Sequence, residues 1–391
     1  LSEARSRAVS VWLDARPRDD LAAYLDGLRP VVELSRRYAE AVRGDADELY
    51  DALLDDYEPG ARAAELEPLL AELAAGVRPL VEPATAASPP PLPAATWPSD
   101  AQVELAHEVA ELIGFDLEHG AIARSAHPFT TSIGAGDVRF TTRVDEAEPV
   151  SNIRAVLHEA GHALYEQGFP ARLAGTFAHD APSLGAHESQ SLFWENHVGR
   201  TDGFWQALEP ALVRLFPQAM GSVGIERVTR TSRRVQPSLI RVEADEVTYN
   251  LHIVLRFRLE LALVRGDLPL QDLPAAFDDG MEELLGLRPP QAADGVMQDI
   301  HWPQGLIGYF PTYSLGHLYA AQLAETAARE VGPISDLAGE GSFSPILAFL
   351  RRTVHERARL VRTDELMRDA NGDGLSTEPF VRHLRSQYLP A

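Results

Sequence analysis

The chain has 391 residues, of which 45% are hydrophobic and 24% are charged, a balance typical of a globular protein rather than a disordered one. Its formal net charge of -23 argues against nucleic acid as a partner, because so acidic a surface repels phosphate. The sequence contains no cysteine and no lysine, which excludes disulfides, thiolate metal ligands, thiol nucleophiles and lysine Schiff bases.

Residues 1–80 are predicted to be helical. Apolar residues recur there at three- and four-residue spacing, for example in VVELSRRYAEAVRG and ARAAELEPLLAELAAGV. The stretch 82–98 is rich in Pro and Ala and breaks this pattern, so we interpret it as a surface connection. We expect a single domain over 1–391, made of N-terminal helices (1–80), the connection (82–98) and a core (101–391).

Neither a membrane span nor a secretory signal is indicated. No uncharged apolar run approaches the roughly 18 residues of a membrane span. The opening stretch LSEARSRAVSVWLDARPRDD is charged throughout, unlike a secretory signal. We therefore expect a cytoplasmic location and no membrane partner.

Only one stretch gives a clear β signal. Residues 125–147 include HPFTTSIGAGDVRFTTRVDE, where Thr, Val and Phe flank a glycine-containing turn, and this pattern predicts a short hairpin. Helices are predicted from residue 151 to the end. The expected fold class is therefore mainly α, with one small β hairpin or short sheet.

The stretch VLHEAGHALYEQG, residues 156–168, lies in a predicted helix. Ser151 or Asn152 can cap its start, and Gly168 followed by Pro170 can end it. The buried face is expected to consist of Ile153, Val156, Leu157, Ala160 and Leu164.

Two histidines of this helix are spaced for metal binding. His158 and His162 project from one face about one turn apart, so that both imidazoles can reach one ion at about 2 Å. Glu159 lies beside the first histidine and can face a metal-bound water. This is the H-E-x-x-H arrangement of zinc hydrolases. The alternative is a pair of solvated histidines on an ordinary helix.

A third ligand is expected from SLGAHESQSLFWENHVG, residues 183–199. Ser183 can cap a second helix, and Glu188 follows His162 at a distance that allows a turn and an antiparallel return. His187 is the competing ligand. Glu195 lies two helical turns after Glu188 and is predicted to support the metal ligands from behind.

Six motifs together give the chain a family resemblance. They are HPF (127–129), DVRFTT (137–142), HEAGH (158–162), HESQ (187–190), IRVEADEVTY (240–249) and HWPQGLIGYFPTYSLG (301–316). In this order they resemble the M32 family of metallocarboxypeptidases, the carboxypeptidase Taq family. The resemblance implies a helical fold with a deep groove, similar to neurolysin and angiotensin-converting enzyme. It also implies a homodimer that removes single residues from the C-terminus of peptides.

The resemblance assigns roles at the metal. His158, His162 and Glu188 are implied to bind one divalent ion, and Glu159 is implied to be the general base. Zinc is the expected ion, although a His-His-Glu site also accepts cobalt or manganese.

Recognition of the substrate carboxylate suits arginine, whose planar fork pairs with a carboxylate through two hydrogen bonds. The resemblance implies that Arg241 is this anchor. In the family, the loop that contains Asp137, Arg139 and Thr141 closes the narrow end of the groove. Arg139 either makes a second substrate contact or supports the loop, and the alternative is an internal salt bridge with Asp137. His127 is predicted to contact substrate.

Two further groups of polar residues are candidates. His301, Tyr309 and Tyr313 are predicted to donate hydrogen bonds to the oxyanion of the tetrahedral intermediate, and the alternative is aromatic packing. Asp245, Tyr249 and His252 share a helix face and are predicted to orient a metal-bound histidine, and the alternative is a polar packing network.

The chain is shorter than typical family members, and we expect it to lack about a hundred residues of an N-terminal helical segment that partly roofs the groove. Such a loss affects substrate range more than chemistry. One alternative function is a peptidyl-dipeptidase or oligopeptidase that uses the same metal site. A second alternative is an inactive, shortened peptide-binding homologue.

Overall fold

Helices form most of residues 1–389, which are the part of the chain that the computed structural model describes. The chain divides into two compact units. The first unit comprises Leu1–Ala87, Val235–Ser314 and the described residues from Leu384 onward. The second unit comprises Ser88–Arg234 and Leu315–His383. The expectation that they act as a single domain stays a prediction.

The first unit is built around α11, on which α4 and α12 pack. Its helices are α1 (Ser2–Ala15), α2 (Leu21–Val42), α3 (Leu49–Leu54), α4 (Ala63–Ala87), α11 (Glu246–Arg265) and α12 (Leu273–Leu285). The chain leaves this unit in α13 (Pro311–Val331) and returns to it in α17 (Glu378–Tyr388).

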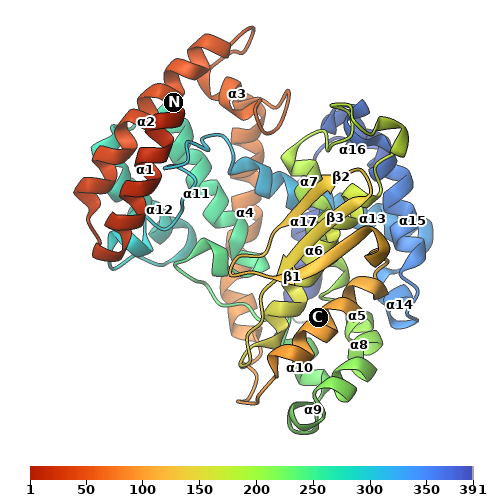
Figure 1. The fold of residues 1–391 in the computed structure, drawn as a ribbon. Coiled ribbons are helices and arrows are strands. Elements are labelled where there is room, and N and C mark those ends of the chain that lie inside the picture. The colour runs from red at the N-terminus through yellow and green to blue at the C-terminus, as the bar shows by residue number, and fades with distance from the viewer. Residues whose placement is uncertain (390–391) are drawn as a thin grey trace. The chain divides into compact units, whose positions relative to one another are not determined.

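The second unit is built around α6, against which α5, α7 and a small sheet pack (Figure 1). Besides the strands described below, several α-helices lie wholly within this unit. They are α5 (Ser99–Leu112), α6 (Pro149–Gln167), α7 (Leu184–Leu192), α8 (Asp202–Leu215), α9 (Pro217–Val223), α10 (Ile225–Thr231), α14 (Ile334–Gly339), α15 (Ser344–Thr353) and α16 (Thr363–Asn371).

The sheet has three strands in the order β1-β3-β2. The predicted hairpin is confirmed, because β2 (Thr130–Gly134) pairs antiparallel with β3 (Asp137–Thr142). Sequence reasoning missed β1 (Gly120–Arg124), which pairs with β3 in parallel. The strand GAIAR contains Gly and Ala and a single β-branched residue, so its sequence carries little β signal.

Two predicted boundaries are wrong. Helix α4 continues to Ala87 through Pro79 and Pro83, so the first part of the predicted connection is helical. Helix α6 begins at Pro149, and its cap is Glu148, whose carboxylate accepts a hydrogen bond of 2.7 Å from the Ser151 backbone nitrogen. Proline suits the first helical position because its missing N–H would have no partner there.

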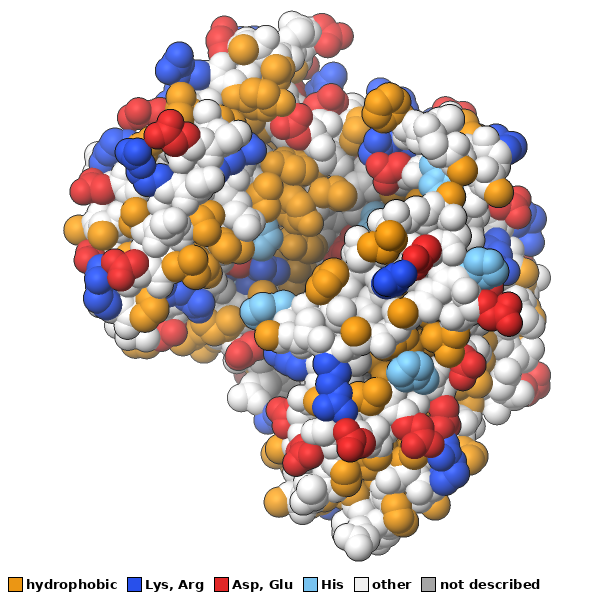
Figure 2. Space-filling model, in the orientation of Figure 1, with side chains coloured by type: hydrophobic (Ala, Val, Ile, Leu, Met, Phe, Trp, Pro, Cys, Tyr) orange, Lys and Arg blue, Asp and Glu red, His pale blue; other side chains and the backbone are white. Residues whose placement is uncertain are grey.

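The surface mixes charges of both signs. Figure 2 shows acidic and basic side chains interspersed on one face rather than gathered by sign. Exposed ion pairs such as Arg382 with Glu325 also bring charges of opposite sign together. Within residues 1–389, none of the helices combines the length and the apolar character that crossing a bilayer requires.

Candidate active site

The candidate metal site depends on a close approach of α6 and α7. Gly161 makes this approach possible, because a Cβ at this position would lie 2.6 Å from the backbone oxygen of Gln190 and 2.7 Å from the Cα of Ser191. The predicted apolar stripe of α6 is buried, and Ser183 caps α7 as predicted, accepting a hydrogen bond of 3.0 Å from the Ala186 nitrogen. The helices thereby bring His162 of α6 beside Glu188 of α7.

His158, His162 and Glu188 form a group that could hold a metal ion. Their candidate ligand atoms all lie within 4.8 Å of one another. Oε2 of Glu188 lies 3.4 Å from Nε2 of His162 and 3.9 Å from Nε2 of His158. Ligand atoms on one tetrahedral zinc ion are about 3.3 Å apart, given bonds of about 2 Å. Two imidazoles and one carboxylate also form a ligand set typical of catalytic zinc, so these residues fit the ion.

Both histidines are oriented through their other ring nitrogens. Nδ1 of His158 lies 2.9 Å from Oε2 of Glu195, and Nδ1 of His162 lies 3.1 Å from the backbone oxygen of His187. Because both partners are acceptors, each Nδ1 carries the hydrogen and each Nε2 is left for a metal. Arg154 donates two hydrogen bonds, of 3.1 and 2.9 Å, to the other oxygen of Glu195.

The histidines and carboxylates of this group shift one another's pKa. Burial alone lowers the pKa of His158, but the carboxylates of Glu188 and Glu195 together outweigh it and raise the pKa from 6.5 to about 10. Burial raises the pKa of Glu188, whereas His158 and His162 lower it, with a net value of about 2. Glu188 is therefore ionised at neutral pH, and without a metal His158 holds a proton that a bound cation displaces.

Two local features position Glu188 of α7 and Glu195 of the segment that follows it. Helix α7 continues into a π-helical segment, Phe193–Val198, and this segment carries Glu195. Gly316 of α13 packs on Glu188, since a Cβ at Gly316 would lie 2.8 Å from both Cβ and Cγ of Glu188. A larger residue at Gly316 would displace the candidate ligand.

Glu159 is the candidate general base, and it is held by a residue that sequence reasoning missed. Its side chain is buried, and Oγ1 of Thr130 lies 2.7 Å from its Oε2 and 2.9 Å from its backbone oxygen. Thr130 begins β2, 29 positions before Glu159. The periodicity of a helix or a strand relates residues within one element, so it could not predict this contact between β2 and α6.

His187, the competing ligand, points elsewhere. Its Nε2 lies 3.0 Å from Oε1 of Glu166, and its ring stacks on that of His162 with ring centres 4.3 Å apart. It therefore supports the ligand His162 and is not one of the three residues grouped around the candidate ion. Glu166 was also missed, although it lies one helical turn after His162 on α6.

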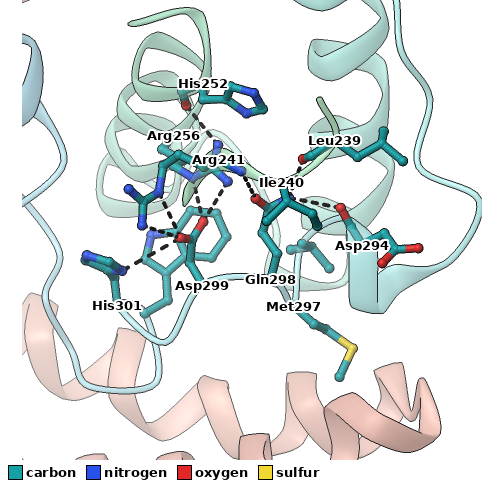
Figure 3. Close-up of polar contacts among 12 residues, drawn as sticks. Leu239, Ile240, Arg241, His252, Arg256, Asp294, Met297, Gln298, Asp299 and His301 are labelled. Carbon is teal, nitrogen blue, oxygen red and sulfur yellow. Dashed lines mark hydrogen bonds and ion pairs between the residues drawn. The ribbon is translucent and has the colours of Figure 1, made fainter. Parts of the chain in front are cut away.

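Arg241, in the first unit, is buried in a cluster of charges (Figure 3). Its Nε and Nη2 both lie 2.9 Å from Oδ1 of Asp299, and Nε of Arg256 lies 2.7 Å from Oδ2 of the same carboxylate. Two guanidinium groups thus share one carboxylate, which leaves one positive charge in excess. Burial and Arg241 lower the pKa of His301 to about 4, so His301 is neutral at pH 7.

Three candidate oxyanion donors lie in the same unit and contact one another. Nε2 of His301 lies 3.2 Å from the hydroxyl of Tyr313, and the rings of Tyr309 and Tyr313 meet edge to face at 5.3 Å. The ring of His301 also packs on Phe310 at 4.6 Å. The aromatic packing that was the alternative interpretation is therefore present, and the role as donors stays a prediction.

Comparisons with known proteins decide the family. The family model described as carboxypeptidase Taq (M32) metallopeptidase matches residues 1–388. The chain belongs to the M32 family. This confirms the predicted class, a metal-dependent carboxypeptidase that acts on peptides.

The chain is similar to several carboxypeptidases, both in sequence and in structure. Thermostable carboxypeptidase 1 of Thermus thermophilus is 46% identical over 399 residues, which cover 99% of this chain and 78% of the relative. The crystal structure of the M32 carboxypeptidase from Deinococcus radiodurans R1 superposes with a TM-score of 0.96 at 35% identity, covering 99% of this chain and 78% of that one. A structure of the Pyrococcus furiosus carboxypeptidase gives a TM-score of 0.95 at 37% identity, covering 99% and 79%. The expected fold class is confirmed.

In this M32 protein, Arg139 and Thr141 of the predicted loop both make contacts within the stretch that was predicted as a hairpin. Nε and Nη2 of Arg139 lie 2.8 and 2.7 Å from the two carboxylate oxygens of Asp137, so the internal salt bridge that was the alternative is present, and a second contact with substrate stays a prediction. Thr141 supports the HPF segment, because its Oγ1 accepts a hydrogen bond of 3.0 Å from the Phe129 nitrogen. His127 is exposed in that segment, and its contact with substrate stays a prediction.

Asp245 and Tyr249 make hydrogen bonds within their own unit, and the Nδ1 atoms of His158 and His162 contact Glu195 and the His187 backbone instead. Oδ1 of Asp245 caps α11 by accepting hydrogen bonds of 3.0 Å from the nitrogens of Val247 and Thr248. The Tyr249 hydroxyl accepts a hydrogen bond of 3.0 Å from Nη1 of Arg241. His252 is buried, and its backbone oxygen accepts from Arg256 at 2.9 Å. The polar packing network that was the alternative interpretation is therefore present, and the orienting role stays a prediction.

Proposed function

We propose that this M32 protein removes single amino acids from the C-terminus of peptides, with one zinc ion held by His158, His162 and Glu188 and with Glu159 as general base. The observation that carries the proposal is the group of three ligand atoms within 4.8 Å, beside which α6 places Glu159. The ligand set favours zinc, while cobalt and manganese also accept nitrogen and oxygen ligands.

The ion, when bound, lowers the pKa of a water molecule and polarises the scissile carbonyl group. Glu159 then accepts a proton from the attacking water as the oxygen–carbon bond forms. It delivers that proton to the amide nitrogen as the carbon–nitrogen bond breaks, so that the product leaves as a neutral amine. The buried position of Glu159 favours both transfers, because little solvent competes for the proton.

Arg241 is proposed to receive the C-terminal carboxylate of the substrate. The excess positive charge of the cluster formed by Arg241, Arg256 and Asp299 supports this role, because a buried cationic site attracts an anion. Tyr249 fixes one nitrogen of the Arg241 fork. His301, Tyr309 and Tyr313 are proposed to donate hydrogen bonds to the oxyanion, and neutral His301 is suited to donate from one ring nitrogen.

We also propose that the protein acts in the cytoplasm as a homodimer, as the family resemblance implies. Light scattering coupled to size exclusion tests the second point, and a monomeric mass at micromolar concentration would contradict it.

The products of one peptide test the proposed cleavage pattern. A peptide with a free C-terminus and its C-terminally amidated twin are incubated with the protein and analysed by mass spectrometry over time. We expect a ladder of one-residue losses from the free peptide, little cleavage of the amidated one, loss of activity with a chelator, and recovery with zinc. Two-residue steps or internal cuts would favour a peptidyl-dipeptidase or oligopeptidase, and metal binding without cleavage would favour an inactive homologue.

A further inference from the structure

The hydroxyl group of Thr130 lies against the carboxylate of the candidate base. Its Oγ1 is 2.7 Å from Oε2 of Glu159 and 2.9 Å from the Glu159 backbone oxygen. A hydroxyl has one hydrogen to donate, and a bond to an ionised carboxylate is stronger than a bond to a neutral carbonyl group. The hydrogen of Thr130 therefore points to Oε2.

We propose that Thr130 is a positioning residue for the reaction, which fixes the Glu159 carboxylate so that Oε1 carries the proton. The inference rests on the proposed role of Glu159 as general base. Because Oε2 accepts the Thr130 hydrogen bond, Oε1 is the oxygen that receives the proton of the attacking water. The same proton then passes from Oε1 to the leaving nitrogen, and the hydrogen bond from Thr130 to Oε2 is kept throughout.

The sheet holds Thr130 in place. Thr130 pairs with Phe140 of β3, which is only 1% exposed. One residue earlier, the Phe129 oxygen accepts a hydrogen bond of 2.9 Å from the Thr141 nitrogen, and the Phe129 nitrogen donates to Oγ1 of Thr141 at 3.0 Å. The motif DVRFTT therefore builds the strand against which Thr130 is registered. Through Thr130, the strand formed by this motif therefore helps to position the candidate base Glu159.

A second hydroxyl group of β2, that of Ser132, also forms a hydrogen bond with a glutamate of α6. Side chains two positions apart lie on one face of a strand, so Ser132 shares the face of Thr130. Ser132 forms a side-chain hydrogen bond with Glu166, which lies two helical turns after Glu159 on α6. One face of β2 thus contacts two glutamates of α6, and Glu166 in turn contacts His187 beside the ligand His162.

A merely structural role is the competing explanation. The bond to the Glu159 backbone oxygen could tie β2 to α6 without any effect on the carboxylate. The two explanations differ in the effect of Thr130→Val on kcat when the Glu159 carboxylate is absent. A structural role predicts the same loss of kcat, whereas a positioning role predicts a smaller loss. A double-mutant cycle between Thr130 and Glu159 measures this difference directly.

The experiment compares Thr130→Val, Thr130→Ser and Thr131→Val in the zinc-loaded full chain, each with the wild-type residue and with Gln at position 159. Thr131→Val makes the same chemical change at the next residue, whose side chain lies on the opposite face of β2. We expect Thr130→Val to lower kcat by about tenfold or more, with KM and bound zinc unchanged. Thr130→Ser restores kcat to within about twofold, because it restores the hydroxyl donor.

In the Glu159→Gln background, we expect Thr130→Val to cost less than about twofold. An equal loss of kcat in both backgrounds would overturn the inference, as would a Thr130→Ser variant that fails to restore kcat. A fall in bound zinc that accounts for the loss would also overturn it. Near-normal turnover by Glu159→Gln alone would contradict the role of Glu159 as general base. An inactive Glu159→Gln variant together with a normal kcat for Thr130→Val would contradict only the role of Thr130.

Discussion

The Nδ1 atom of His158 lies 2.9 Å from Oε2 of Glu195, and this contact turns the Nε2 of His158 toward Glu188. Glu195 is carried by the π-helical segment that follows α7, so the orientation of one candidate ligand depends on an irregular turn of helix. Burial raises the pKa of Glu195, but the neighbouring Arg154 and His158 hold it well below its usual range. The carboxylate therefore stays ionised behind the ring and increases its basicity.

Replacing Glu195 by Gln is expected to weaken zinc binding by about tenfold to a hundredfold, because Gln keeps the acceptor but removes the charge. Affinity is measured by competition with a chromophoric chelator. Activity is expected to return at saturating zinc, since both oxygens of Glu195 are engaged by Arg154 and His158. Glu226→Gln removes the same charge from an exposed position on α10 and serves as the control. Equal zinc affinity in both variants would refute the role of Glu195.

Replacing Gly161 by Ala is expected to destabilise the fold by about 2 kcal/mol and to weaken zinc binding, because the added Cβ meets the backbone of α7 at 2.6 Å. Thermal unfolding and zinc titration measure the two effects. Gly221→Ala in α9 is the matched control, since a Cβ there meets nothing within 4 Å. That control is expected to be neutral or stabilising, as Ala is the better helix former. The close approach is unimportant if both variants behave alike.

Glu260 is predicted to make stability depend on pH. Burial raises its pKa from 4.5 to about 7, although Gly308, Trp302 and Tyr50 donate hydrogen bonds to it. A carboxyl group with a raised folded pKa stabilises the fold fully below its unfolded pKa, and this contribution is lost as pH rises through the folded value.

The loss amounts to about 3 kcal/mol, given about 1.4 kcal/mol for each pKa unit. Glu260→Gln cannot titrate, so the free energy of unfolding of the metal-free variant is expected to fall less than that of the wild type between about pH 5 and about pH 8. Chemical denaturation at the two pH values measures the difference. An identical pH dependence in both proteins would show that Glu260 does not titrate in this range.

Arg241→Lys is expected to raise KM for peptides with a free C-terminus by about tenfold or more, because lysine keeps the charge and loses the planar fork. The effect on amidated peptides is expected to be small, so the preference for a free carboxylate shrinks. Arg258→Lys on the exposed face of α11 is the control. An unchanged preference in Arg241→Lys would assign carboxylate recognition to another residue.

The sequence allowed the metal group to be predicted because its signals are local. The spacing of His158 and His162 follows from helical periodicity, and Ser183 marks the start of the helix that carries Glu188. Thr130 was missed because its contact with Glu159 joins a strand and a helix, and no periodicity relates them. Their proximity is a result of the tertiary packing of β2 on α6.

The charge cluster of the first unit was predicted only in part. Arg241 was identified by a motif, whereas Asp299 and Arg256 were not. A signal for Arg256 exists, because the stretch LHIVLRFRLELALV is otherwise dominated by apolar residues and a buried arginine there requires a counter-ion. The sequence does not reveal which acidic residue pairs with it. Asp299 lies 43 positions later, in a segment between helices.

The central claim is that Glu159 moves the proton while His158, His162 and Glu188 hold the ion. The most direct test measures bound zinc per chain and kcat on the same preparation of Glu159→Gln. We predict wild-type zinc content with kcat lowered by about a hundredfold to ten-thousandfold, the range typical of a lost general base. Wild-type zinc content together with near-normal kcat would contradict the account.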